Sequence, residues 1–154
     1  MKMKLETENE FVRGTVSGAI SATAICLFSE LFEAIGLAKH CWLYLAGQPI
    51  MNFNHGFLPT VFAILLHLGI GSFWGVISAF LFSKVFTDRY YLLKGIVIGF
   101  AIFFLHFGLL NQTFHYRPAL RADLLTLFIF FLSYLLYGGL TAFLLRKLPL
   151  DDPS

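Results

Sequence analysis

The chain has 154 residues and a net charge of +2, with 58% hydrophobic and only 13% charged residues. Soluble domains carry about a quarter charged residues, and a chain this short lacks the interior volume to bury so much apolar surface. The composition therefore excludes an ordinary soluble domain and indicates a protein in lipid, while the lack of basic runs or RNA-binding motifs argues against a nucleic-acid partner.

The first long apolar stretch covers residues 12–35 and follows the segment MKMKLETENEFVRG. Three glutamates interrupt the basic residues of that segment, and no small-residue cleavage site follows, so we expect a retained membrane span rather than a secretory signal. Cys26 falls within this span and Cys41 after it. The two form no CxxC motif, which favours a packing role over a redox pair for Cys26.

The connection over residues 37–58 is longer than a tight turn and mixes aromatic rings, among them Trp42 and Tyr44, with polar side chains. This mixture is typical of a stretch in the membrane interface. We expect Gly47 and Pro49 to break it in the middle. It is either an interfacial linker, which the pattern favours, or a lid over the bundle.

Three further stretches, at residues 59–83, 93–111 and 122–146, are long and apolar enough to cross a bilayer. Pro59 opens the second span, and Pro118 lies in the turn before the fourth. The sequence predicts an all-α integral membrane four-helix bundle, with residues 1–154 as a single transmembrane domain and an interfacial segment between the first two helices.

Lysine and arginine predict the orientation. All such residues except Lys39, Arg117 and Arg121 lie near the N-terminus, at or between the facing ends of the second and third spans, or at the end of the fourth. Because the side richer in these residues faces the cytoplasm, we expect both termini inside and a multi-pass protein of the cell membrane.

The first three spans each contain a GxxxG motif, which permits close backbone approach between helices. The residues expected at these contacts are Gly14, Gly18, Gly71, Gly75, Gly95, Gly99 and, on the fourth span, Gly138.

The polar residues of the spans share helix faces with these small residues, so we expect them to point into the bundle, where polar groups avoid lipid. Most lie toward the outer end, which predicts a polar cavity open to the outer leaflet. Its expected members are Glu30, Glu33, His67, His106, Asn111, Gln112, His115, Arg117, Arg121, Asp123 and Tyr134. These residues have two alternative roles. They form ion pairs that only position the helices, or they form a site that binds a ligand.

A metal is the alternative for two of these residues. His67 and His106 fall at comparable depth, and two histidines on facing helices are able to hold haem iron, while carboxylates and histidines together suit Zn or Fe. The Glu-x-x-His signature of di-iron bundles is missing, since SELFE offers Glu-x-x-Glu alone. We therefore expect no metal or cofactor, with haem or Zn/Fe as the alternative, and hydrogen-bonded imidazoles as the favoured state.

The layout resembles the YqhR-type family of small bacterial four-span membrane proteins. The resemblance rests on VRGTVSG, LKGIVIGFAIFF, LLNQTF and SYLLYGG, although the third segment continues as NQTFH where the family pattern leads us to expect NPIFP. The resemblance implies four spans and a bacterial plasma membrane, and it implies no particular activity.

No catalytic motif is present, so the sequence leans against an enzyme. The favoured function is an accessory or ligand-binding membrane protein that holds a lipid headgroup, a small molecule or a partner membrane protein. A haem or metal protein and a small transporter or channel subunit are the alternatives. The large lipid-facing perimeter leaves room for homo-oligomers.

Overall fold

The structure, a computed structural model, describes residues 2–47, 56–86, 89–110 and 123–148. The elements in these ranges are α1 (Lys2–Ala34), α2 (Trp42–Gly47), α3 (Phe57–Lys84), α4 (Tyr91–Phe103), the π-helix η1 (Phe104–Leu110) and α7 (Leu124–Lys147). All of them are helical, which confirms the predicted fold class.

Four stretches of helix are long and apolar enough to cross a membrane: Glu8–Ala34, Phe57–Lys84, Tyr91–Leu109 and Leu124–Lys147. Large apolar side chains such as Leu27 (67% exposed) and Leu65 (62%) cover the outer faces of these helices. Such a surface is unfavourable in water and ordinary in lipid. The helix α1 begins about ten residues before the predicted span, because the helical backbone continues into the polar N-terminal segment.

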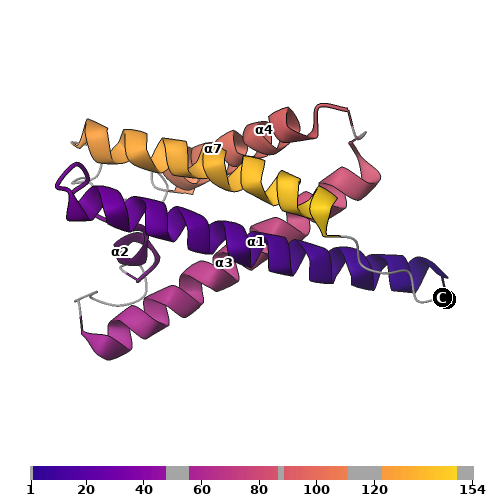
Figure 1. Cartoon of the computed structure of the whole chain (residues 1–154), viewed down its shortest axis with the longest axis horizontal. Helices are drawn as coiled ribbons and strands as arrows, with labels where there is room; N and C mark the ends of the chain where they lie inside the picture. The colour runs from indigo at the N-terminus through magenta and orange to yellow at the C-terminus, as the bar shows by residue number, and fades with distance from the viewer. Residues whose placement is uncertain (1, 48–55, 87–88, 111–122, 149–154) are drawn as a thin grey trace.

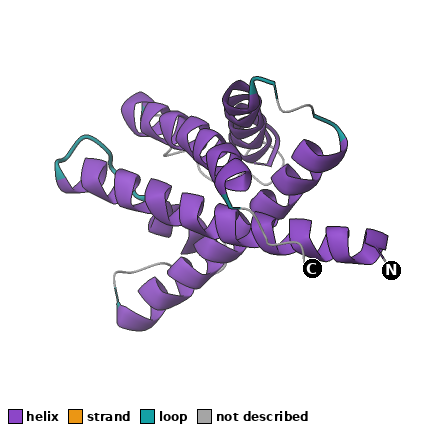
Figure 2. Ribbon diagram, turned by 45° about the vertical axis from the view of Figure 1, so that its right-hand side comes forward, coloured by secondary structure: helices purple, strands orange, loops and turns teal. Residues whose placement is uncertain are grey.

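The helices alternate in direction, and the two chain termini lie at the same end of the molecule (Figure 2). Figure 1 shows α7 beside α1, with α3 inclined across α1 and α4 beside α7. The bundle is thus two helix pairs, α1 with α3 and α4 with α7, joined through the contact between α1 and α7. We call the end that holds the termini the terminal end, and the opposite one the polar end.

Glycines bring α1 and α3 into backbone contact. A Cβ atom added at Gly75 would lie 2.6 Å from Cα of Gly18, and one added at Gly14 would lie 2.5 Å from Cα of Val76. These distances are too short for a Cβ atom at either glycine, so the close approach of the two helices depends on these glycines.

Glycines also bring α4 and α7 into backbone contact. A Cβ atom at Gly99 would lie 2.9 Å from the carbonyl carbon of Tyr134, and one at Gly138 would lie 2.7 Å from the amide nitrogen of Gly99. Gly95 packs on Gly138 and Ala142. Close approach of the backbones gives each pair dispersion contacts that long side chains would prevent.

Part of the connection after α1 packs into the protein core. Trp42, at the start of α2, is only 8% exposed, and its ring contacts His67 of α3 and Tyr134 of α7. Figure 1 shows α3 diverging from α7 toward this end, with α2 beside them. The indole fills the space that the divergence opens, so this aromatic side chain packs against other helices.

The third span also departs from a straight α-helix. From Phe104 to Leu110 it continues as a π-helix, whose wider turn rotates the following side chains relative to an α-helical register. His106 lies in this segment, so an angle extrapolated from Gly95 does not fix its direction.

Candidate functional site

The polar end begins where α1 stops. Gly36 adopts a left-handed backbone with φ of 76°, its N–H donates to the carbonyl of Glu33 over 2.9 Å, and the N–H of Leu37 donates to that of Phe32 over 2.9 Å. This pair of bonds is the Schellman arrangement that ends a helix with glycine. It turns the chain back toward the last turns of α1.

The returning chain is fixed to α1 by a serine. The hydroxyl of Ser29, which is fully buried, accepts a hydrogen bond from the backbone N–H of Trp42 over 3.1 Å. This contact places Cys41, the preceding residue, against the face of α1 that carries Glu30 and Glu33.

One ligand atom from each of Glu30, Glu33 and Cys41 lies within 4.8 Å of the other two. Cys41 is 2% exposed, and the two glutamates are half-buried. The Oε1 atom of Glu30 is buried without a hydrogen-bond partner. In the described part of the chain neither carboxylate forms an ion pair, so two negative groups share one partly buried corner.

The corner combines acidic side chains with the end of a helix. Both carboxylates lie in the last turns of α1, where the exposed carbonyl groups already create a partial negative charge. Burial, together with the neighbouring carboxylates of Glu30 and Glu33, raises the pKa of the Cys41 thiol above its usual range. The thiol is therefore neutral at physiological pH, and it does not add a third negative charge.

A second group of contacts ties the same connection to the start of α7. The backbone N–H of Lys39 donates to Oγ1 of Thr126 over 2.9 Å, and the Thr126 hydroxyl donates to Asp123. The ammonium of Lys39, 73% exposed, lies 3.8 Å from the Asp123 carboxylate. An exposed pair of this kind contributes little, so the backbone contact through Thr126 is the stronger of the two.

The two predicted histidines lie in the core rather than at the glutamate corner. The Nε2–H of His67 donates to the carbonyl of Ala22 over 2.9 Å. Nε2 of His106 accepts from the indole N–H of Trp74 over 3.3 Å, so its other nitrogen, Nδ1, carries the proton that is donated to the hydroxyl of Tyr134.

These contacts bear on the alternative that His67 and His106 together hold a haem iron or another metal. The rings form a chain of neighbours from His67 through Trp42 and Tyr134 to His106. Both ring nitrogens of His106 are already hydrogen-bonded, so metal ligation there would break a hydrogen bond inside the membrane. The arrangement favours hydrogen-bonded imidazoles.

Of the remaining residues predicted to line the polar cavity, two lie in the described part of the chain. Tyr134 is a core residue, and Asp123 lies at the start of α7 beside Thr126. Five others lie outside the described residues: Asn111, Gln112, His115, Arg117 and Arg121.

Sequence reasoning missed Cys41, Thr126 and Trp74. A lone cysteine outside any motif carries no ligand signal, and its approach to Glu30 depends on the turn at Gly36. The Glu-x-x-Glu of SELFE was the one available hint, because it puts two carboxylates on one helical face.

Comparison of the chain with models of protein families, with curated proteins and with solved structures yields no match. The fold itself defines the class, since four apolar helices of spanning length make this a multi-pass membrane protein. The resemblance to the YqhR-type family stays a prediction.

Proposed function

We propose that the protein is a non-enzymatic, ligand-binding membrane protein, and that the ligand at its polar end is a divalent cation held by Glu30, Glu33 and Cys41. The observation that carries the proposal is the buried, unpartnered Oε1 of Glu30 next to two further ligand atoms. A buried carboxylate oxygen without a donor is costly, and a cation would remove that cost.

The donor set indicates which cation. Carboxylate oxygens alone would suit Mg²⁺ or Ca²⁺, whereas a cysteine sulfur is a soft ligand that those ions avoid. Zinc accepts both sulfur and carboxylate oxygen and takes four ligands. Three protein ligands would leave one position for water or for a further group. Binding would displace the Cys41 proton to solvent, since the thiolate is the ligand form.

The location of the site fits a protein that holds its ligand near the membrane surface. Glu30 and Glu33 lie in the last turns of the first span, within about two helical turns of its end at Ala34. We further propose that this end faces outward and that both termini face the cytoplasm of a bacterial cell, on the basis of the lysine and arginine distribution. Membrane lipid surrounds the helices in this proposal, with a second copy or a partner membrane protein on the lipid-facing perimeter.

The test uses full-length protein purified in detergent without chelator. Zinc content is measured by mass spectrometry of the metal, and Co²⁺ replaces zinc as a probe because a Co²⁺–thiolate bond absorbs in the near ultraviolet. We expect about one Zn²⁺ per chain, a Co²⁺–thiolate band, and a saturable rise in thermal stability with added Zn²⁺.

Two variants and one matched control locate the ligands. Cys41→Ser should abolish the Co²⁺–thiolate band, and Glu30→Gln should weaken zinc binding by about tenfold or more. Cys26→Ser removes the other free cysteine and should leave both properties unchanged. Wild-type protein that neither contains nor binds zinc would overturn the proposal, as would a Cys41→Ser variant that keeps wild-type affinity. The absorption spectrum of the same sample also tests the haem alternative through its Soret band.

A further inference from the structure

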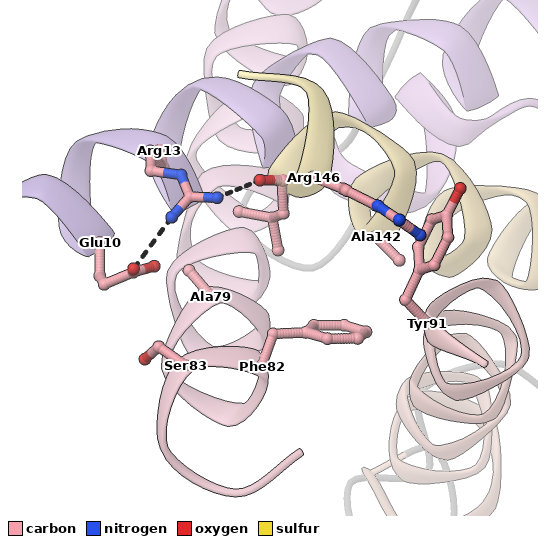
Figure 3. Close-up of a pocket in the computed structure, with 9 residues that line it drawn as sticks. Glu10, Arg13, Ala79, Phe82, Ser83, Tyr91, Ala142 and Arg146 are labelled. Carbon is pink, nitrogen blue, oxygen red and sulfur yellow. Dashed lines mark hydrogen bonds and ion pairs between the residues drawn. The ribbon is translucent and has the colours of Figure 1, made fainter. Parts of the chain in front are cut away.

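At the terminal end, a cavity of about 300 Å³ opens between the four long helices (Figure 3). Its inner wall is apolar and consists of Ala79, Phe82, Ala142 and Leu145. Its rim is polar and carries two arginines, Arg13 from α1 and Arg146 from α7. Small-molecule sites commonly combine an apolar lining with a few polar or charged groups that orient the ligand.

Arg13 is held in place from two sides. Its Nη1 atom pairs with Oε1 of Glu10 over 3.0 Å, and its Nη2 donates to the carbonyl of Leu145. The Nε atom of Arg13 is buried and has no hydrogen-bond partner. The two contacts fix the guanidinium, and each Nη atom carries a second N–H that neither contact uses.

Arg146 supplies the second charge. Its guanidinium carbon lies 4.5 Å from the ring centroid of Tyr91, and Figure 3 shows this side chain extending toward Tyr91, away from Arg13. The ring contact orients the guanidinium without consuming its N–H donors. Two guanidinium groups against the single carboxylate of Glu10 leave the rim with one surplus positive charge.

We propose that this cavity binds a phosphate group, contributed by an anionic lipid headgroup or by a free phosphate ester. Planar guanidinium groups match phosphate oxygens through paired hydrogen bonds. The volume lies at the lower limit for small-molecule sites, so it accommodates a headgroup rather than a whole lipid.

The charge and the depth of the cavity refine this assignment. One surplus positive charge complements the single negative charge of a phosphodiester. Arg13 lies five residues inside the first span, which starts at Glu8, and Arg146 lies in the last turn of the fourth. This is the level at which lipid phosphates meet basic side chains. The site is at the opposite end of the bundle from the cation site and does not depend on it.

The experiment titrates purified full-length protein in detergent with dioctanoyl phosphatidylglycerol, with dioctanoylglycerol, which lacks the phosphate, and with glycerol 3-phosphate, which lacks the chains. Binding is measured by native mass spectrometry and by the shift in unfolding temperature. We expect saturable binding of the phosphatidylglycerol and at least about tenfold weaker binding of dioctanoylglycerol. Glycerol 3-phosphate identifies the source, because equal affinity for it would assign the site to free phosphate esters and weak affinity to lipid.

Variants then separate the cavity from general surface charge. Arg146→Gln removes a rim charge, and Ser83→Trp fills the cavity without changing charge, from an exposed position on its lining. We expect each to weaken binding by about tenfold or more, while Lys147→Gln, an exposed neighbour outside the cavity, changes affinity by less than about threefold. Equal losses in Arg146→Gln and Lys147→Gln would overturn the proposal, as would equal binding of the phosphate-free lipid or no saturable binding by wild type.

Discussion

Trp74 donates its indole N–H to Nε2 of His106 across 3.3 Å. The donor is on α3 and the acceptor is on the π-helix η1. The α3 helix packs mainly on α1 rather than on η1. Because His106 also contacts the hydroxyl of Tyr134 on α7, one imidazole links three of the four spans.

The first prediction is a measurable coupling between these two residues. A double-mutant cycle with Trp74→Phe and His106→Phe, measured by unfolding in detergent, should give a coupling free energy of about 0.6 kcal/mol and no more than about 1.7, the range for hydrogen bonds between membrane helices. Additive effects of the two substitutions would contradict the hydrogen bond.

The second prediction concerns the α1–α3 contact and has an internal control on the same helix. Gly75→Ala places a methyl group 2.6 Å from Cα of Gly18 and should lower the free energy of unfolding by about 1–3 kcal/mol. Gly69→Ala adds the same atom where no neighbour lies within 4 Å, so it should be neutral or stabilise by up to about 1 kcal/mol. Equal effects of the two substitutions would mean that the helices do not meet at Gly75.

The third prediction uses adjacent glycines on α7. A Cβ atom at Gly138 would lie 2.7 Å from the backbone nitrogen of Gly99, whereas one at Gly139 meets only a side-chain carbon of Ile96 at 3.5 Å. Gly138→Ala should therefore lower the unfolding temperature of the detergent-solubilised protein, and Gly139→Ala should leave it nearly unchanged. A larger loss in Gly139→Ala would show a different face of α7 toward α4.

The fourth prediction compares two contacts that link the first connection with α7. Thr126→Val removes the hydroxyl that accepts the N–H of Lys39 and should cost about 1–3 kcal/mol, because the N–H loses its partner. Lys39→Gln removes only the exposed end of an ion pair and should cost less than about 1 kcal/mol. Both are measured by thermal unfolding, and the reverse order of effects would show that the ion pair, not the backbone contact, holds this connection.

The fifth prediction is the topology. A fluorescent reporter fused after Ser154 should be active, and an alkaline phosphatase fused there should be inactive, because the distribution of basic residues predicts a cytoplasmic C-terminus. A phosphatase inserted between Asn111 and Asp123 should be active. The opposite pattern would invert the protein in the membrane and move the glutamate corner to the inner side.

The four spans were predictable because spanning length and apolar composition are local properties of the chain. The glycine faces were also readable, since a period of four places Gly14 and Gly18 on one side of a helix. The contacts of Trp42 were not predictable, because an aromatic ring suits both the membrane interface and a packed core. Its position depends on the space beside His67 and Tyr134, which only the assembled helices define.

The cavity at the terminal end was beyond sequence reasoning for a related reason. Arg13 and Arg146 each resemble an ordinary basic residue at a cytoplasmic helix end. They lie far apart in the chain, and no local pattern indicates that α1 and α7 bring them to one rim. The approach of Cys41 to Glu30 has the same origin, since it depends on how one turn reverses the chain.

The unequal lengths of the spans have a consequence for the surrounding bilayer. The 28 residues of α3 cover about 42 Å along the helix axis, and the 19 residues of the third span, which ends in a π-helix, cover at most about 28 Å, whereas the hydrocarbon layer is about 30 Å thick. The α3 side therefore exceeds the hydrophobic thickness of the membrane and the α4 side falls just short of it. Tilting shortens the projection of α3, as its inclination to α1 allows (Figure 1). Any hydrophobic mismatch that remains would deform the surrounding bilayer differently on the two sides of the protein. The bilayer would be thicker beside α3 and thinner beside α4.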